Sequence, residues 1–179
     1  KDNKVKKVFT NSDYEPYATK RDAMVAELLQ PNGIQFTAVK DHVIFERSEV
    51  MKDDGTPYNV YTPYMKRWRS LLKPEHLKAL PSEKYFSNFN KTSAAPVMSL
   101  QEIGFREAVM DVPSLTVSDE LIQHYGDLRD IPGVAGTSRL GVHLRFGTIS
   151  LRALARQSYT ISEKFFNELI WREFYQMIL

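Results

Sequence analysis

A strand–helix–strand pattern in the first 45 residues constrains the fold more than any other feature. Residues 5–11 (VKKVFTN) predict a short strand, and residues 34–45 (IQFTAVKDHVIF) predict a buried strand continued by a second extended piece. An amphipathic helix lies between them, with Asp13 as its candidate cap, Pro16 in its first turn and PNG at 31–33 as its end. This spacing predicts a βαβ unit, with parallel strands and a right-handed crossover.

One βαβ unit does not make a stable domain by itself. A parallel sheet is normally buried on both faces, which requires more strands and helices on either side. The last stretch, NELIWREFYQMIL (167–179), likewise predicts a helix with no stop signal after Leu179. We therefore expect the chain to be the central fragment of a larger protein.

The pattern changes twice after the βαβ unit. A helix begins near Pro63 in TPYMKRWRSLL, but residues 75–115 show no clean period and contain several prolines. From residue 116 onward the chain reads as helices with short breaks. The predicted fold class is α/β followed by all-α. Residues 1–70 are expected to form the end of an α/β domain, residues 71–115 an interdomain connector, and residues 116–179 the beginning of an incomplete helical domain.

Composition excludes several classes of site. The chain contains no cysteine, so it has no disulfide, thiolate zinc site or cysteine nucleophile. No apolar run is long enough to span a membrane, and KDNKVKKVFT lacks the apolar core of a signal peptide. The formal net charge of +2 does not by itself indicate a nucleic-acid partner. We expect a cytoplasmic protein without a membrane partner.

The pentapeptide GTSRL (136–140) predicts a helix N-terminus. Such a terminus presents free N–H groups and can hold a phosphate, with Thr137 and Ser138 as hydrogen-bond donors and Arg139 as added charge. The other interpretation is that Thr137 or Ser138 only caps a helix, and the pentapeptide alone favours it. Further on, Gly147 separates two helical stretches, and Ser150 is the candidate cap of the second, because serine is preferred at helix N-caps.

The last helix combines a conventional apolar face with an unusual polar one. TISE (160–163) predicts a capping box between Thr160 and Glu163. The helical period places these residues on the core face: Phe166, Ile170, Phe174 and Met177. It places these on another face: Glu168, Trp171, Arg172 and Tyr175.

Two explanations of these charges stay open from spacing alone. Glu168 and Arg172 are four residues apart, which favours an ion pair along the helix. Alternatively, the charges serve a site, because buried charge is costly unless it is paired or used. Upstream, HYGDLRD (124–130) places Tyr125 and Arg129 one turn apart. The histidines stand alone, without a partner at metal-ligand spacing, so no metal site is predicted.

Taken in order, these segments resemble the DNA photolyase/cryptochrome family, and most of all its microbial cyclobutane pyrimidine dimer (deoxyribodipyrimidine) photolyases. The segments that carry the resemblance are YGDLRDIPGVAGTSRL, HLRFGTIS and FFNELIWREFYQMIL, preceded by NSDYEPYATKRD, KDHVIFE and GTPYNVYTPYMKRW. The resemblance implies that residues 1–70 end the Rossmann-like antenna domain. It also implies that residues 116–179 begin the FAD-binding helical domain.

The resemblance also implies roles for individual residues. The catalytic positions are Glu168, which hydrogen-bonds the base edges of the lesion, and Trp171, which packs on the flipped dimer. The DNA-binding positions are Arg129, Glu168, Trp171 and Arg172. The FAD-binding positions are Tyr125, Thr137, Ser138, Arg139, Leu140 and Gly141, where Gly141 replaces the family's usual serine.

The implied function is light-driven DNA repair by a flavoprotein lyase, in which photoexcited reduced FAD passes an electron to a flipped-out dimer in UV-damaged DNA. The alternative within the family is a cryptochrome, a blue-light FAD sensor without repair activity. A second antenna chromophore, folate or deazaflavin, is possible in either case, and the full-length protein is expected to be a monomer. The 179-residue piece alone is expected to be inactive, because the rest of the FAD pocket would lie beyond Leu179.

Overall fold

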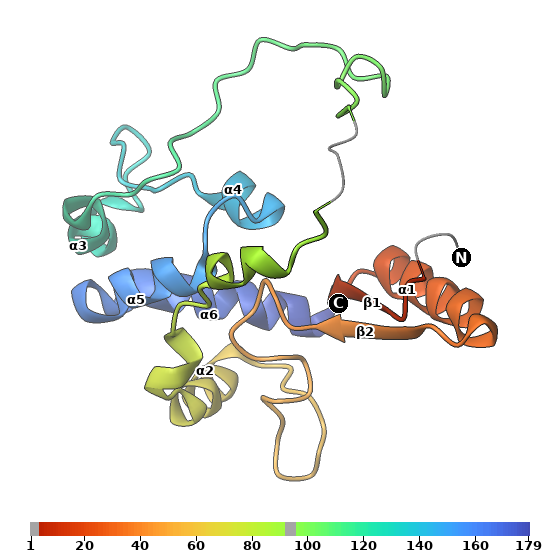
Figure 1. Ribbon diagram of the computed structural model, residues 1–179. Coiled ribbons are helices and arrows are strands. Elements are labelled where there is room, and N and C mark those ends of the chain that lie inside the picture. Colours follow the sequence, from red (N-terminus) through yellow and green to blue (C-terminus); the bar gives the residue numbers. More distant parts are fainter. Residues whose placement is uncertain (1–3, 92–95) are drawn as a thin grey trace.

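The computed structural model describes residues 4–91 and 96–179 of the chain and contains a small sheet followed by helices (Figure 1). Two short strands and one helix come first, a second helix and a long open segment follow, and four helices end the chain. The strands and α-helices are β1 (Lys7–Asn11), α1 (Pro16–Leu29), β2 (Gln35–Val39), α2 (Tyr61–Leu71), α3 (Asp119–Leu128), α4 (Gly141–Phe146), α5 (Leu151–Ile161) and α6 (Glu163–Ile178). Three 3₁₀ segments are η1 (Gln30–Asn32), η2 (Pro74–Leu77) and η3 (Ser82–Asn88).

The predicted βαβ unit is confirmed. Strand β1 pairs in parallel with β2, in a register that runs from Lys7 opposite Gln35 to Asn11 opposite Val39, and α1 connects them. Pro16 occupies the first turn of α1, and Gly33 ends η1 in the left-handed region at φ +67°, a conformation that glycine adopts without strain.

Two details of this unit were predicted wrongly. Strand β2 ends at Val39, and the following residues bend toward the helices, so no second extended piece exists at 43–45. These residues are buried against other elements, and that burial explains their apolar character. Asp13 does not cap α1: the N-cap is Glu15, and the Asp13 carboxylate accepts a hydrogen bond from the Glu15 amide instead.

The start of α5 and the end of α4 follow their sequence signals, whereas the start of α6 does not. Ser150 caps α5 by accepting a hydrogen bond from the Ala153 amide, and Gly147 ends α4 at φ +65°. The predicted capping box at 160–163 is wrong, because Thr160 still belongs to α5. The break falls at Ser162, whose extended backbone ends α5 and whose hydroxyl accepts from the Phe165 amide to start α6.

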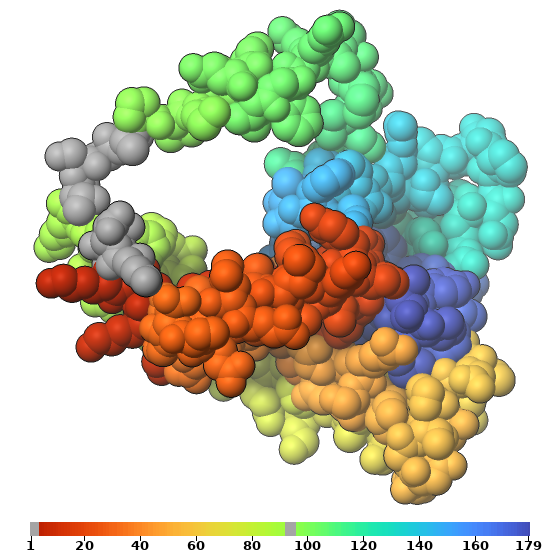
Figure 2. Space-filling view, turned by 90° about the vertical axis from the view of Figure 1, so that its right-hand side faces the viewer, coloured from red at the N-terminus to blue at the C-terminus, as the bar shows by residue number. Residues whose placement is uncertain are grey.

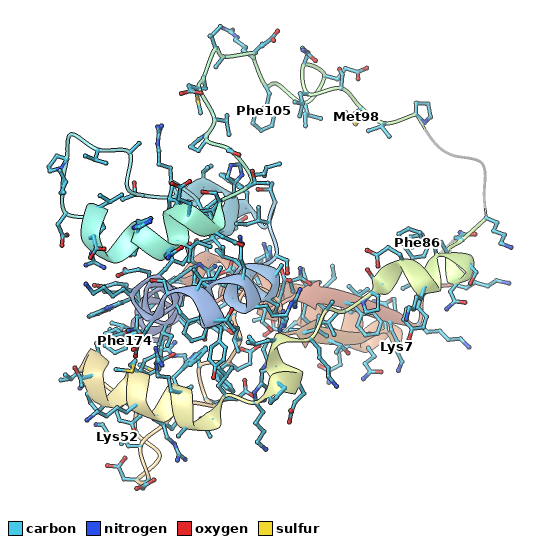
Figure 3. The ribbon with its side chains drawn as sticks, turned by 90° about the vertical axis from the view of Figure 1, so that its left-hand side faces the viewer. Lys7, Lys52, Phe86, Met98, Phe105 and Phe174 are labelled. Carbon is cyan, nitrogen blue, oxygen red and sulfur yellow. The ribbon has the colours of Figure 1, made fainter. Side chains whose placement is uncertain are left out.

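The apolar face of α6 lies at the centre of the core, as predicted. All four residues of the predicted stripe are buried: Phe166, Ile170, Phe174 and Met177. They pack with Trp68 and Tyr64 of α2, with Ile122 of α3, and with the segment 44–50 that follows the sheet. Figure 3 shows Phe174 between α6 and α2. The same core therefore joins segments from both sides of the open connector, and the exact domain boundaries remain a prediction.

The connector departs furthest from the rest of the molecule. Within the described part of the chain, no α-helix or strand occurs between η3 and α3, and residues 97–112 arch away from the helices (Figures 1 and 2). Phe86, Met98 and Phe105 lie on these outlying segments with most of their side chains exposed (Figure 3). Over residues 4–91 and 96–179, no helix combines the length and the apolar character needed to cross a bilayer.

The core position of α6 predicts a sharp difference between two isoleucines of one helix. Ile170→Ala should lower the free energy of unfolding by about 2–4 kcal/mol, because Ile170 is fully buried and its loss leaves a cavity. Ile178→Ala should cost less than about 1 kcal/mol, because that side chain is 55% exposed. Urea denaturation followed by circular dichroism measures both, and equal losses would contradict the placement of α6.

Candidate functional site

The polar face of α6 meets the end of α3. The Arg129 guanidinium, just after α3, forms an ion pair with the Glu168 carboxylate, and each side chain is 37% exposed. Of the two explanations left open by the spacing, the ion pair between Glu168 and Arg172 is therefore not the one observed. Tertiary packing of α3 on α6 brings a closer cation to Glu168, and Arg172 turns toward other partners. The nearby carboxylate raises the pKa of Arg129, which keeps its guanidinium protonated.

Tyr125 lies beside this ion pair. Its ring meets the buried Phe165 ring edge-on, with centroids 5.1 Å apart, and the Arg129 guanidinium lies over it at 5.4 Å. Burial, followed by the charge of Glu168, raises the pKa of the Tyr125 hydroxyl, so it stays protonated. Tyr125, Arg129, Phe165 and Glu168 thus form one continuous surface, here named the α3–α6 patch.

Trp171 belongs to an aromatic stack. Its indole lies parallel to the Tyr61 ring of α2, with centroids 3.5 Å apart and 6° between planes. Tyr175, which is 61% exposed, stacks on the same indole at 5.5 Å and 24°. The Tyr61 hydroxyl donates to the Asn167 carbonyl at 3.1 Å, and burial raises its pKa to about 12, with Glu168 as the next contribution. Tyr61 was missed by sequence reasoning, because nothing local in YTPYMKRW (61–68) points to a residue near position 171.

The GTSRL loop precedes helix α4 without capping it. The N-cap of α4 is Leu140, and no side chain bonds the free amides there, so the capping interpretation of Thr137 and Ser138 is wrong. Neither hydroxyl has a hydrogen-bond partner within the residues that the structure describes. Arg139 is exposed and adopts a left-handed backbone at φ +53°.

Gly136 holds this loop against the end of α3. A Cβ at this position would lie 2.5 Å from the Leu128 Cβ and 2.7 Å from the Leu128 carbonyl oxygen, so only glycine fits. Leu140 is buried and anchors the other end of the loop, and Gly141 begins α4 with open space around it. The hydroxyls and Arg139 are therefore presented outward from a firmly anchored loop.

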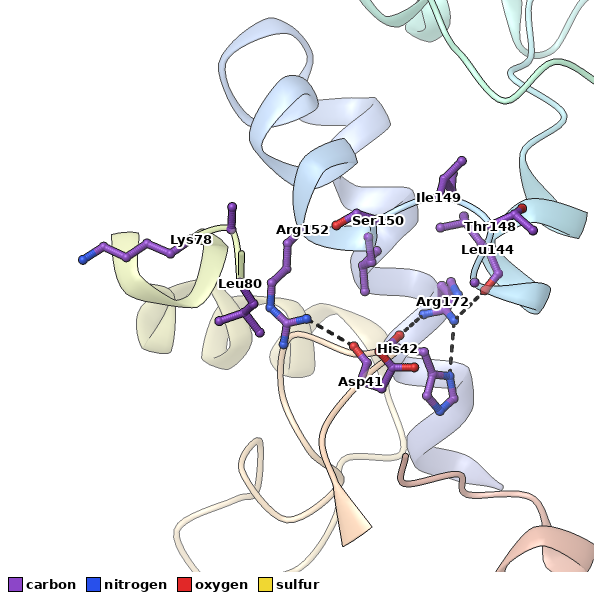
Figure 4. A pocket seen from close by; sticks show the side chains of 13 residues that line it. Asp41, His42, Lys78, Leu80, Leu144, Thr148, Ile149, Ser150, Arg152 and Arg172 are labelled. Carbon is purple, nitrogen blue, oxygen red and sulfur yellow. Dashed lines mark hydrogen bonds between the residues drawn. The ribbon is translucent and has the colours of Figure 1, made fainter. Parts of the chain in front are cut away.

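Arg172 lies on a different side of α6. Its guanidinium donates to the His42 carbonyl at 2.6 Å and to the Leu144 carbonyl at 3.4 Å (Figure 4). Burial lowers the pKa of Arg172, an effect that the charge of Glu173 opposes. The structure thus separates Arg172 from the α3–α6 patch, and its assignment to DNA stays a prediction.

Glu173 is the most deeply buried charged residue that sequence reasoning left without a role. Its carboxylate accepts hydrogen bonds from the backbone amides of Ile44 and Phe45 and, at 2.7 Å, from Trp68 Nε1. Burial nevertheless raises its pKa to about 7, because desolvation outweighs these bonds and the charge of Arg172. Its partners lie more than a hundred residues away in sequence, so no local pattern could reveal them.

The described residues contain no group of three histidines or carboxylates that could hold a metal ion. The prediction of no metal site therefore meets no contrary observation in this part of the chain, and it stays a prediction.

Comparison with known proteins matches this arrangement to one family. The family model for DNA photolyase matches residues 1–84. A deoxyribodipyrimidine photo-lyase of Halobacterium salinarum is 32% identical over 97% of this chain and 41% of its own length. One of a Synechococcus species is 32% identical over 96% of this chain and 41% of its length. The chain belongs to the DNA photolyase family.

A solved structure supports the same fold for this photolyase chain. The class III photolyase of Agrobacterium tumefaciens superposes with a TM-score of 0.64 over 97% of this chain and 40% of its own, at 20% sequence identity. That identity shows the fold alone. The chain spans about 41% of the length of the curated relatives named above.

The buried carboxyl of Glu173 predicts a pH dependence of stability. Its pKa rises from an ordinary 4.5 to about 7 on folding, so the folded chain binds the proton more tightly. The free energy of unfolding should therefore fall as pH rises from 4.5 to 7. Urea denaturation at half-unit pH steps measures this slope.

Glu173→Gln should remove the contribution of this carboxyl to the slope. It should also lower stability by about 1–3 kcal/mol at pH 5, because an amide N–H would face one of the three donors. Glu27→Gln, at an exposed position of α1, provides the matched control and should keep the wild-type slope. An unchanged slope in Glu173→Gln would contradict the assignment.

The stack on Trp171 predicts a spectroscopic effect. Tyr61→Leu should change the near-ultraviolet circular dichroism of Trp171 and lower stability by about 1 kcal/mol beyond the lost apolar area. Tyr61→Phe keeps the ring and loses only the hydrogen bond to Asn167, so its spectrum should stay close to the wild type. Each spectrum is compared with that of the wild type, so the unchanged contribution of Trp68 cancels, and identical spectra for both variants would refute the stacking.

Proposed function

We propose that this chain forms part of an enzyme that splits cyclobutane pyrimidine dimers in UV-damaged DNA with light. One observation carries the proposal: Glu168 and Trp171 lie one turn apart on α6, partly exposed, and each is held by a partner from another element. The relatives named as deoxyribodipyrimidine photo-lyases supply the reaction class. Their names describe those proteins, and the transfer to this chain is the proposal.

The two residues suit a flipped-out lesion. A damaged base pair is extruded at lower cost than an intact one, and extruded bases need an aromatic surface and a hydrogen-bond partner. Trp171 offers a ring plane that Tyr61 fixes, and Glu168 offers carboxylate oxygens at a half-exposed position. A preorganised polar group beside the pyrimidine carbonyls can stabilise charge that develops there.

Arg129 has two tasks in this proposal. Its ion pair orients the Glu168 carboxylate, and its remaining N–H groups are exposed enough to reach a DNA phosphate. Phosphate contacts of this kind add affinity without sequence preference, which suits an enzyme that must act on lesions in any sequence. Arg172 is less suited to the same task, because two backbone carbonyls occupy its guanidinium.

The loop residues fit a flavin nucleotide. Thr137, Ser138 and Arg139 present hydroxyls and a cation without partners in the described chain, and these groups match a diphosphate. Tyr125, Leu140 and Gly141 complete the positions proposed to hold FAD. When bound, FAD supplies the light-driven electron transfer that opens the cyclobutane ring. This chain's residues hold the lesion and the cofactor and contribute charge at fixed positions.

The test uses a protein of the relatives' full length that carries this sequence. Glu168→Ala should lower the quantum yield of dimer repair about tenfold or more, because it removes a hydrogen bond to a charged group. FAD absorbance should be unchanged. Glu163→Ala, an exposed position in the first turn of α6, should repair normally.

Two outcomes oppose the proposal in different ways. Loss of FAD in Glu168→Ala would make Glu168 a structural residue of the cofactor pocket. Bound FAD without any light-dependent repair in the unsubstituted protein would instead favour the sensor function of cryptochromes.

A further inference from the structure

A cleft of about 340 Å³ lies outside the α3–α6 patch, where four segments meet (Figure 4). The turn between α4 and α5, the residues after β2, the end of η2 and the middle of α6 form its walls. Its polar lining consists of Asp41, His42, Lys78, Thr148, Ser150, Arg152 and Arg172. The volume is at the lower end of the range for small-molecule sites.

Two arginines in this cleft lack a carboxylate partner. Arg172 donates to the carbonyls of His42 and Leu144, and Arg152 donates to the carbonyls of Asp41 and Val43 at 3.2 and 3.4 Å. All ion pairs found in the described chain involve other cations. The two guanidinium charges are thus bound by uncharged backbone carbonyls. The partial burial of Arg172 lowers its pKa.

The other polar groups of the cleft are mostly donors. His42 Nδ1 lies 3.2 Å from the Gln176 amide nitrogen and 3.5 Å from an Arg172 nitrogen, which are both donors. Nδ1 must therefore accept, and the neutral ring carries its proton on Nε2, which is buried without a partner in the described structure. The free amides at the start of α5 add further donors.

Most acceptors of the cleft already have hydrogen-bond partners. The carbonyls of residues 41, 42, 43 and 144 bind the two arginines. The Thr148 hydroxyl lies 2.8 Å from the His143 ring. The single carboxylate, Asp41, accepts a hydrogen bond from the Asn11 amide at 2.8 Å. A ligand here would therefore meet unused donors and positive charge.

We propose that this cleft binds a small phosphate-bearing anion. Phosphate oxygens accept several hydrogen bonds at once, and arginine is well suited to bind them. The cleft is closed on several sides by separate segments, which favours a small molecule over a DNA backbone. The site is independent of lesion binding, because it shares no residue with the α3–α6 patch and does not depend on the proposed repair function.

The test titrates a protein of the relatives' full length that carries this sequence with inorganic diphosphate, in calorimetry at low ionic strength, after saturation with FAD so that the loop at 137–139 is already occupied. Saturable binding with one site is expected, and Arg152→Gln should weaken it at least tenfold. Arg67→Gln, which removes an exposed arginine of α2 away from the cleft, should bind like the wild type. Absence of saturable binding would overturn the proposal.

Because Arg152 also holds the backbone of residues 41–43, a second pair of variants keeps both arginines. Leu80 lies at the cleft and is 74% exposed, so its replacement should not disturb the core. Leu80→Glu should weaken diphosphate binding at least tenfold, because its carboxylate competes for the arginines, whereas Leu80→Gln should bind normally. Equal affinity of these two variants would overturn the site, as would displacement of diphosphate by undamaged duplex DNA.

Discussion

The buried carboxyl of Glu173 joins the three parts of the chain on which the site depends. It accepts hydrogen bonds from the segment after the sheet, through Ile44 and Phe45, and from α2, through Trp68, while it belongs to α6. Burial of a carboxyl is costly unless its oxygens are satisfied, and here three N–H donors converge on them. An apolar residue at position 173 would leave all three N–H donors without an acceptor. The three donors therefore require a side chain with acceptor oxygens at this position.

Different sides of helix α6 contact different parts of the molecule. One face is apolar and fills the core, and a second presents Glu168 and Trp171 to α3 and α2. A third carries Arg172 into the cleft beside His42. Residues adjacent in sequence are about 100° apart on a helix, so Trp171, Arg172 and Glu173 reach three separate environments. The clamp on Glu173 fixes the rotation of α6 and therefore fixes all three.

This arrangement shows how a small number of supporting residues hold the side chains proposed to meet the lesion. Trp171 depends on Tyr61 from α2, and Glu168 depends on Arg129 beside α3, so the proposed lesion-binding face is assembled from elements far apart in sequence. Each supporting residue acts through packing or charge and holds a neighbour in one geometry. The cleft at Arg152 and Arg172 uses the same principle beside this face of α6, with backbone carbonyls as the supports.

Local sequence signals determined much of the fold. The βαβ unit, the turns at Gly33 and Gly147, the cap at Ser150 and the apolar stripe of α6 follow from short-range propensity and periodicity, and the structure confirms them. The ordered motifs from residue 125 to 179 also indicated the family, which the comparisons establish. Where two local solutions compete, as with Thr160 and Ser162, sequence reasoning chose the wrong one.

Only the tertiary structure decided which side chains and backbone groups pair with each other. Spacing along the helix favoured Arg172 for Glu168, but packing of α3 brought Arg129 to it, and Arg172 went to the carbonyls of His42 and Leu144. The stack of Tyr61 on Trp171 and the three donors to Glu173 are equally invisible in the sequence. The physical reason is common to all of them: propensity and periodicity act over a few residues, whereas charges and rings are satisfied by whichever groups folding brings near.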